Sequence, residues 1–255
     1  MGVAAPRGVG PAGDGQITWT ELVLSCEHAS EHVPAEWRES LGGDLRWLGT
    51  HRAFDPGAAD LARFLARRLR APVQLAPVSR LLVDPNRDED HAGVFGPSVS
   101  QRPAAERSAL IERYHRPYRD AVRARLRKAL AGLPTGGRLL HLSVHSFTPR
   151  LRGITRPCEL GIMYDPGRSV ESRLAEQWRR HFAELDARLR VRRNYPYVGK
   201  SIYFQPHLRA ALRDRRYLAL QIEVSQKLPR RQPERWARFQ EALLEVLRAS
   251  RDDTK

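Results

Sequence analysis

The chain has 255 residues, of which 44 are basic and 29 acidic, and its net charge is +15. This length suffices for one buried α/β core or at most two small domains. Apolar runs stay well below the ~18 residues that a membrane span needs, so we expect no membrane contact. The two cysteines, Cys26 and Cys158, exclude a disulfide framework.

Residues 1–16 are rich in Gly, Ala and Pro and lack the apolar stretch of a secretory signal. We therefore predict a disordered lead-in over 1–16, a single folded domain over 17–250, and a cytoplasmic protein.

The positive charge raises the question of nucleic-acid binding. The basic excess is almost entirely Arg, spread over amphipathic stretches that also contain Glu and Asp, and this pattern is typical of solvated helical faces. We expect no specific nucleic-acid partner. A non-enzymatic nucleic-acid-binding protein remains the alternative, and it rests on charge alone.

The first half of the chain alternates between strand and helix periodicity. In chain order, the pattern predicts a strand at 18–26, a helix at 56–70, short strands at 73–77 and 80–84, a loop at 88–101, and a long helix at 103–133 with a break near Pro117. The Pro and Gly residues near these boundaries are typical of element ends.

The second half continues the alternation. It predicts strands at 138–144, 160–164 and 218–224, helices at 169–189 and 232–250, and a turn-rich loop at 194–199. Strands that alternate with helices indicate an α/β fold: one three-layer domain with a mostly parallel or mixed central sheet and helices on both faces.

Polar side chains follow the predicted strands directly. His28 comes after the first strand, Asn86 and Arg87 after the strand at 80–84, and His145 after the central strand. Ligand sites in open α/β sheets lie at the carboxyl ends of the strands, so we expect these side chains to converge.

His28 and His145 suit a metal such as zinc, because catalytic zinc takes three protein ligands, commonly two His and one carboxylate, and leaves one position for water. Two carboxylates can complete the set. Glu31 lies three residues after His28, and Asp55 lies in a predicted loop just before a helix. The spacing leaves both open.

Glu223 is a charged residue inside an apolar strand. A buried charge is costly unless it is paired or has a chemical role. Glu223 is therefore either a core ion-pair partner for one of the many Arg residues, or a general base that takes a proton from water and passes it to a leaving nitrogen.

Arg87 can hold a carboxylate through two parallel hydrogen bonds, with Asn86 beside it, although Asp-Pro-Asn at 84–86 also favours a simple turn. Arg80 can instead anchor a neighbouring carboxylate. The loop at 194–199 carries Asn194 and Tyr197, which can line a pocket or form a surface turn.

Eight short motifs in order resemble the N-formylglutamate amidohydrolase family. They are Leu-Ser-Cys-Glu-His-Ala-Ser at 24–30, Phe-Asp-Pro-Gly-Ala at 54–58, Ser-Arg-Leu-Leu-Val-Asp-Pro-Asn-Arg at 79–87, Tyr-His-Arg-Pro-Tyr at 114–118, His-Ser-Phe-Thr-Pro at 145–149, Glu-Leu-Gly at 159–161, Asn-Tyr-Pro-Tyr at 194–197 and Ile-Glu-Val at 222–224. They span most of the chain.

The resemblance implies a zinc carboxypeptidase-like fold, with the metal held by His28, a carboxylate and His145, and with Glu223 as base. The family pattern usually has Asn or Thr where this chain has Glu31, which favours Asp55 as third ligand. The resemblance also implies that Asn86 and Arg87, with help from Arg80 or Arg152, bind the carboxylate of a small N-acyl amino acid.

The resulting hypothesis is a zinc-dependent amidohydrolase that cleaves the amide bond of N-formyl-L-glutamate or a similar N-acyl amino acid. An inactive family member that serves as a binding protein is a further alternative.

Overall fold

Six strands form the central sheet of the computed structural model, which describes residues 16–197 and 204–252. Their order is β2-β1-β3-β8-β6-β7. They are β1 (Glu21–Cys26), β2 (Val73–Leu75), β3 (Leu139–Phe147), β6 (Leu160–Met163), β7 (Val191–Arg193) and β8 (Tyr217–Ser225). Apart from Gln16, the predicted lead-in at 1–16 lies outside the described residues.

The sheet is mixed and mostly parallel, as predicted. β1 pairs in parallel with β2 and β3, β3 with β8, and β6 with β7, whereas β6 runs antiparallel to β8. In the central pair, His145 on β3 lies opposite Glu223 on β8. Because strand side chains alternate between faces, these two residues share one face of the sheet.

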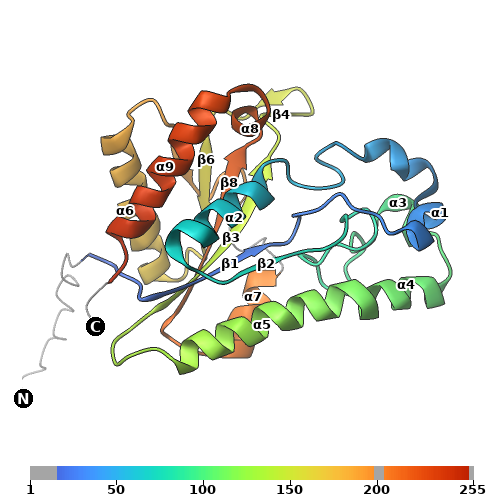
Figure 1. Cartoon of the computed structure of the whole chain (residues 1–255), viewed down its shortest axis with the longest axis horizontal. Coiled ribbons are helices and arrows are strands. Elements are labelled where there is room, and N and C mark those ends of the chain that lie inside the picture. Colours follow the sequence, from blue (N-terminus) through green and yellow to red (C-terminus); the bar gives the residue numbers. More distant parts are fainter. Residues whose placement is uncertain (1–15, 198–203, 253–255) are drawn as a thin grey trace, which may run out of the picture.

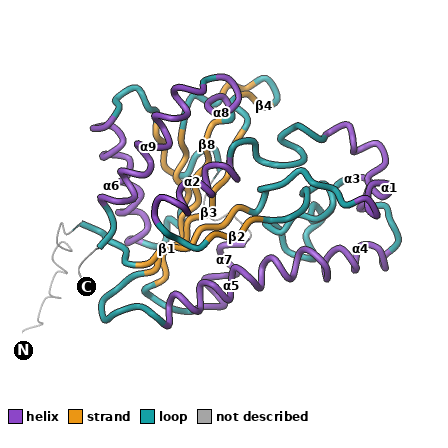
Figure 2. Tube along the Cα trace, in the orientation of Figure 1, coloured by secondary structure: helices purple, strands orange, loops and turns teal. Residues whose placement is uncertain are grey.

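Helices cover both faces (Figures 1 and 2). One face packs against α2 (Ala58–Leu69), α6 (Ser169–Leu185) and α9 (Pro233–Ala249), and the other against α5 (Arg116–Ala131) and α7 (Phe204–Leu212). The predicted three-layer α/β architecture is therefore confirmed, and both layers follow from central strands that are buried on both faces.

A third apolar cluster lies beyond the sheet. It packs η1 (Ala35–Trp37), α1 (Arg38–Leu41), η2 (Gly42–Trp47), α3 (Pro97–Ser100) and α4 (Ala104–Leu110) around buried side chains such as Leu41, Leu82 and Val99. In Figure 1 this part, with α1, α3 and α4, extends to the right of the sheet.

The prediction of a strand at 80–84 is wrong. These residues form turns, with Leu82 N donating to Ser79 O at 3.0 Å and Arg87 N to Asp84 O at 3.1 Å. Leu81, Leu82 and Val83 are nevertheless buried, because they belong to the third cluster and not to the sheet. A short apolar run indicates burial but does not settle which surface buries it.

The long helix at 103–133 does not break at Pro117. α4 continues through a π-helical segment, η3 (Ile111–His115), directly into α5. Proline has no backbone N–H to donate, and a local change of helix geometry before it is a common response. The altered segment ends at His115, immediately before Arg116 and Pro117.

Several short elements were not predicted. They include η1, α1, η2, β7, α7, α8 (Lys227–Arg231) and a separate antiparallel hairpin of β4 (Arg150–Leu151) and β5 (Ile154–Thr155). The segment 88–101, predicted as a loop, contains the short helix α3. The strands and α8 are too short for a periodic pattern to be visible. The helix predicted at 169–189 ends earlier, at Leu185. Across the described residues, no helix combines the length and the apolar character that crossing a bilayer requires.

Candidate metal centre and active site

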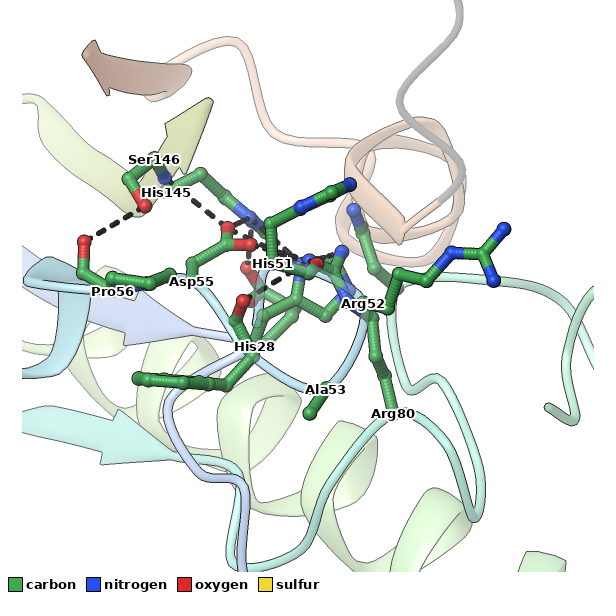
Figure 3. A network of polar contacts seen from close by, with 12 residues as sticks. His28, His51, Arg52, Ala53, Asp55, Pro56, Arg80, His145 and Ser146 are labelled. Atoms are coloured by element: carbon green, nitrogen blue, oxygen red, sulfur yellow. Dashed lines mark hydrogen bonds and ion pairs between the residues drawn. The ribbon is translucent and has the colours of Figure 1, made fainter. Parts of the chain in front are cut away.

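Two imidazoles and one carboxylate meet beyond the carboxyl ends of β1 and β3 (Figure 3). His28 follows β1, His145 lies near the end of β3, and Asp55 sits in the loop before α2. All three residues are at least 95% buried. One ligand atom from each lies within 4.8 Å of the other two.

The three ligand atoms form a compact triangle. Nδ1 of His28 lies 3.1 Å from Nδ1 of His145, and Oδ2 of Asp55 lies 3.4 and 2.9 Å from these two atoms. Ligand atoms around tetrahedral zinc, at bonds of about 2.0–2.1 Å, are separated by about 3.3 Å. The geometry and the His₂–carboxylate donor set therefore fit a zinc-like ion.

Each imidazole donates a hydrogen bond from its other nitrogen to a buried carboxylate. Nε2 of His28 donates to Asp84 at 2.8 Å, and Nε2 of His145 donates to Glu27 at 2.7 Å. Metal-binding histidines are usually held in this way, because the outer carboxylate fixes the tautomer and turns the free lone pair toward the metal. Both Nδ1 atoms therefore face the centre of the triangle.

The carboxylates of this network are held ionised. Burial opposes the charge on Asp55, but the nearby Arg80 and His28 outweigh it and keep the pKa of Asp55 well below its usual range. Burial also opposes ionisation of Glu27, yet hydrogen bonds from His145 and Ser143 lower its pKa. Such groups are suited to hold a cation.

His145 carries the opposite shift. Burial alone would lower its pKa, but the hydrogen bonds to Asp55 and Glu27 on its two sides raise it well above the ordinary value. In the metal-free protein a proton on His145 therefore balances part of the negative charge, and metal binding has to displace it.

Asp55 is placed by the turn that begins α2. Its backbone N–H donates to His28 O at 2.9 Å, and its Oδ2 accepts from Ser146 N at 3.2 Å. Gly57 allows this turn, because its φ is +82° and a Cβ there would lie 2.6 Å from Pro229. The loop thus brings Asp55 to both histidines.

Arg80 braces the same turn. Its Nη2 donates to Asp55 Oδ1 at 2.7 Å and to the carbonyls of His51 and Phe54, and its Nη1 lies 3.0 Å from Nδ1 of His28. The guanidinium therefore lies at the edge of the triangle (Figure 3), where it compensates the negative charge of Asp55.

Glu223 lies in the same cavity and is 4% exposed. Its Oε1 accepts a hydrogen bond from Gln221 at 2.9 Å, and no described residue hydrogen-bonds to its Oε2. Burial raises the pKa of Glu223 to about 7, and the charge of Asp55 adds to this effect. A carboxyl group with one unpaired oxygen and a near-neutral pKa is suited to proton transfer.

A cavity of about 480 Å³ opens over these groups. The predicted site residues that line it are His28, Asp55, Arg80, Asn86, Arg87, His145, Tyr197 and Glu223. Further lining residues are Trp47, Arg52 and Phe95 from the part of the chain that carries the third apolar cluster.

Three predicted site residues lie elsewhere. The carboxylate of Glu31 is not part of the metal-ligand group and accepts a hydrogen bond from Gly49 N. Arg152 lies in the exposed turn between β4 and β5 and does not line the cavity. The side chain of Asn194 accepts from Tyr164 N at 3.1 Å and lines a different, open depression beside β7.

Sequence reasoning missed the two outer carboxylates, Glu27 and Asp84. Both are at least 94% buried. The available signal was a charged residue within an otherwise apolar or small-residue stretch, as in Leu-Ser-Cys-Glu at 24–27 and Leu-Leu-Val-Asp at 81–84. The same signal singled out Glu223.

Among solved structures, the chain is similar to gene product Atu2144 from Agrobacterium tumefaciens, with 29% identity over 91% of both chains and a TM-score of 0.77. It is also similar to a metallo-carboxypeptidase from Burkholderia cenocepacia (14% identity, 91% of this chain and 57% of that chain, TM-score 0.37). For the N-acetylmuramoyl-L-alanine amidase AmiC2 of Nostoc punctiforme the identity is 14%, the coverage 93% and 98%, and the TM-score 0.34. No curated protein matches the chain significantly.

A family model described as N-formylglutamate amidohydrolase matches residues 20–229. This range contains all the candidate ligand, carboxylate and arginine residues described above. Because the match spans most of the 255 residues, the chain belongs to the N-formylglutamate amidohydrolase family.

Proposed function

We propose that the protein is a zinc-dependent amidohydrolase that cleaves the amide bond of N-formyl-L-glutamate or a similar N-acyl amino acid. The observation that carries the proposal is the compact triangle of His28, Asp55 and His145 in one cavity with Glu223. The family membership supports the amidohydrolase class, and the donor set supports zinc.

Nδ1 of His28, Oδ2 of Asp55 and Nδ1 of His145 would hold the ion. When bound, zinc supplies a Lewis acid that lowers the pKa of water and polarises an acyl oxygen. Asp84 and Glu27 keep both imidazoles in the tautomer that leaves Nδ1 available. Arg80 holds Asp55 in place by donating a hydrogen bond to its other carboxylate oxygen, Oδ1.

Glu223 acts as the general base and then as the general acid. Its free oxygen takes a proton from the attacking water, and the protonated carboxyl passes that proton to the leaving nitrogen as the C–N bond breaks. The products are a carboxylic acid and an amine, which for N-formyl-L-glutamate are formate and glutamate.

Arg87 binds a substrate carboxylate and so fixes the distance between the amide and Glu223. Its side chain lines the cavity next to Asn86. Guanidinium and carboxylate form two parallel charge-assisted hydrogen bonds, which give orientation as well as affinity. The proposal leaves Arg152 out of this contact, since Arg152 is not among the residues that line the cavity.

The test is the E223Q variant, measured for zinc content and for hydrolysis of N-formyl-L-glutamate. We expect wild-type zinc content and a loss in kcat of about 10²–10⁴, the range that removal of a general acid–base gives. The same change at Glu159, a buried carboxylate that pairs with Arg190 and does not line the cavity, is the control.

Near wild-type turnover in E223Q would rule out Glu223 as the base. A panel of N-formyl, N-acetyl and N-succinyl amino acids defines the substrate. Zinc binding without turnover of any member of the panel would instead support a binding protein that retains the site.

A further inference from the structure

None of the residues in the Tyr-His-Arg-Pro-Tyr motif at 114–118 is among those that line the cavity. Two of its side chains nevertheless contact residues that support the site. The buried side of α5 is apolar where it crosses the sheet, at Val122, Leu126 and Leu130. At its beginning the same side becomes polar, at Tyr118 and Arg119 and at His115, the residue immediately before α5. Residues three and four apart share one side of a helix, so all six form one stripe.

His115 and Arg119 both donate to one backbone atom. Nε2 of His115 lies 2.8 Å from the carbonyl oxygen of Arg87, and Nη1 of Arg119 donates to the same oxygen at 2.7 Å. Arg119 also donates to Asp88 at 3.2 Å. The loop that presents Arg87 is thus tied to α5 by two side chains one helical turn apart.

The His115 contact is well defined. The residue is 1% exposed, and burial, with the nearby charge of Arg119, lowers its pKa, so the imidazole stays neutral. A carbonyl can only accept, so the proton is on Nε2, and Nδ1 has no hydrogen-bond partner within the described parts of the chain. His115 also ends the π-helical segment, a geometry frequent at functional sites.

Tyr118 reaches the other half of the site. Its hydroxyl donates to Glu27 Oε1 at 3.0 Å, and Oε2 of the same carboxylate accepts from His145. One helical turn therefore contacts the support of the metal ligand through Tyr118 and the support of the substrate arginine through His115.

We propose that His115 and Arg119 are positioning residues that hold the Arg87 backbone, and thereby set how tightly the site binds the substrate carboxylate. This inference rests on the proposed function, in which Arg87 binds that carboxylate. Arg119 is held in place by a further contact, since its guanidinium lies 4.6 Å from the centroid of the Phe204 ring.

The test compares kcat/KM for N-formyl-L-glutamate with kcat/KM for each of its two monocarboxamides. R87Q first identifies which carboxylate Arg87 binds, because only the amide of that carboxylate is turned over equally by R87Q and wild type. We then expect H115L and R119Q to lower the acid-to-amide ratio at least about tenfold, since small misplacement of an orienting group has effects of this size. The loss appears mainly in KM, with zinc content unchanged.

H115Q keeps a donor near the Arg87 carbonyl, and we expect it to recover most of the ratio. R123Q is the matched control for R119Q, since Arg123 lies one turn further along α5 and pairs with Asp120. All variants are first checked by thermal unfolding. If only one of H115L and R119Q folds, that variant decides the test.

A wild-type ratio in a folded H115L or R119Q, together with a changed ratio in R87Q, would overturn the positioning role while leaving the proposed function intact. An unchanged ratio in R87Q would instead remove Arg87 from carboxylate binding. Absence of wild-type turnover on every N-acyl amino acid would refute the proposed function itself.

Discussion

Glu27 Oε2 accepts a hydrogen bond from Nε2 of His145 at 2.7 Å, on the side of the imidazole that faces away from Asp55. Glu27 also accepts from Ser143 and Tyr118, so its carboxylate is fully engaged inside the protein. This single contact sets the tautomer of His145 and turns its Nδ1 toward the candidate metal position.

The first prediction concerns Glu27. E27Q removes the charge behind His145 while keeping a group of similar size, and we expect zinc affinity to fall about 10- to 100-fold, as is usual for outer partners of metal-binding histidines. Competition with a chromogenic chelator measures this affinity. E159Q is again the control, and equal affinities in E27Q and wild type would contradict the assigned role.

The second prediction separates the two candidate carboxylate ligands. D55N replaces the charged ligand by a neutral amide, so we expect purified D55N to contain little zinc. E31Q alters a carboxylate that binds the Gly49 amide, and we expect it to keep one equivalent of zinc and its activity. Metal analysis of both variants decides the matter, and the reverse result would favour Glu31 as the ligand.

The third prediction concerns Glu223 and pH in the metal-free protein. Burial, aided by the charge of Asp55, raises the pKa of Glu223 from 4.5 to about 7. Below 4.5 the carboxyl is protonated in both the folded and the unfolded state, and above 7 it is ionised in both. Between these values the unfolded state loses its proton first, so the free energy of unfolding falls as pH rises, by roughly 3 kcal/mol for this group.

Glutamine does not titrate, so we expect E223Q to lack this part of the decline. Urea unfolding of chelator-treated wild type and E223Q at about pH 5 and about pH 8 gives the difference. Parallel losses of stability in the two proteins would show that other groups, and not Glu223, cause the pH dependence.

The fourth prediction concerns substrate charge at the cavity rim. Arg52 is among the residues that line the cavity, its guanidinium lies 3.9 Å from the centroid of the Trp47 ring, and no ion pair of Arg52 is found among residues 16–197 and 204–252. A stacked, unpaired Arg is suited to a second substrate carboxylate. We expect R52Q to lower kcat/KM for N-formyl-L-glutamate about tenfold relative to N-formyl-L-leucine.

Arg46 provides the matched control for Arg52. Its guanidinium lies 4.9 Å from the centroid of the same Trp47 ring, but it does not line the cavity. R46Q should therefore leave the ratio between the two substrates unchanged. An equal effect of R46Q and R52Q would point to a general loss of charge or to disturbed Trp47 packing.

Parts of the site were predictable because local order and strand geometry carry them. His28 follows β1 and His145 lies near the end of β3, both of which the pattern predicted, and parallel strands bring such ends to one edge of a sheet. Glu223 was noticeable as a charge within an apolar strand, and its register opposite His145 follows from the pairing of β3 with β8.

Other parts depend on contacts that no local pattern contains. Glu31 is three residues from His28 and Asp55 is 27 residues away, yet Asp55 is the one that joins the triangle, because the turn before α2 folds back onto the end of β1. Likewise, the apolar run at 81–83 resembled a strand but is buried by the third cluster.

The amino-acid sequence by itself determined the α/β alternation, the strand-end histidines and the buried charge at Glu223, since these depend on side-chain periodicity and on the cost of burying charge. Only the tertiary structure decided that Asp55, and not Glu31, joins the two histidines, and that His115 contacts the backbone of Arg87. The reason is physical: these relationships are distances between loops and helices, and they are set by how separate segments pack and not by spacing along the chain.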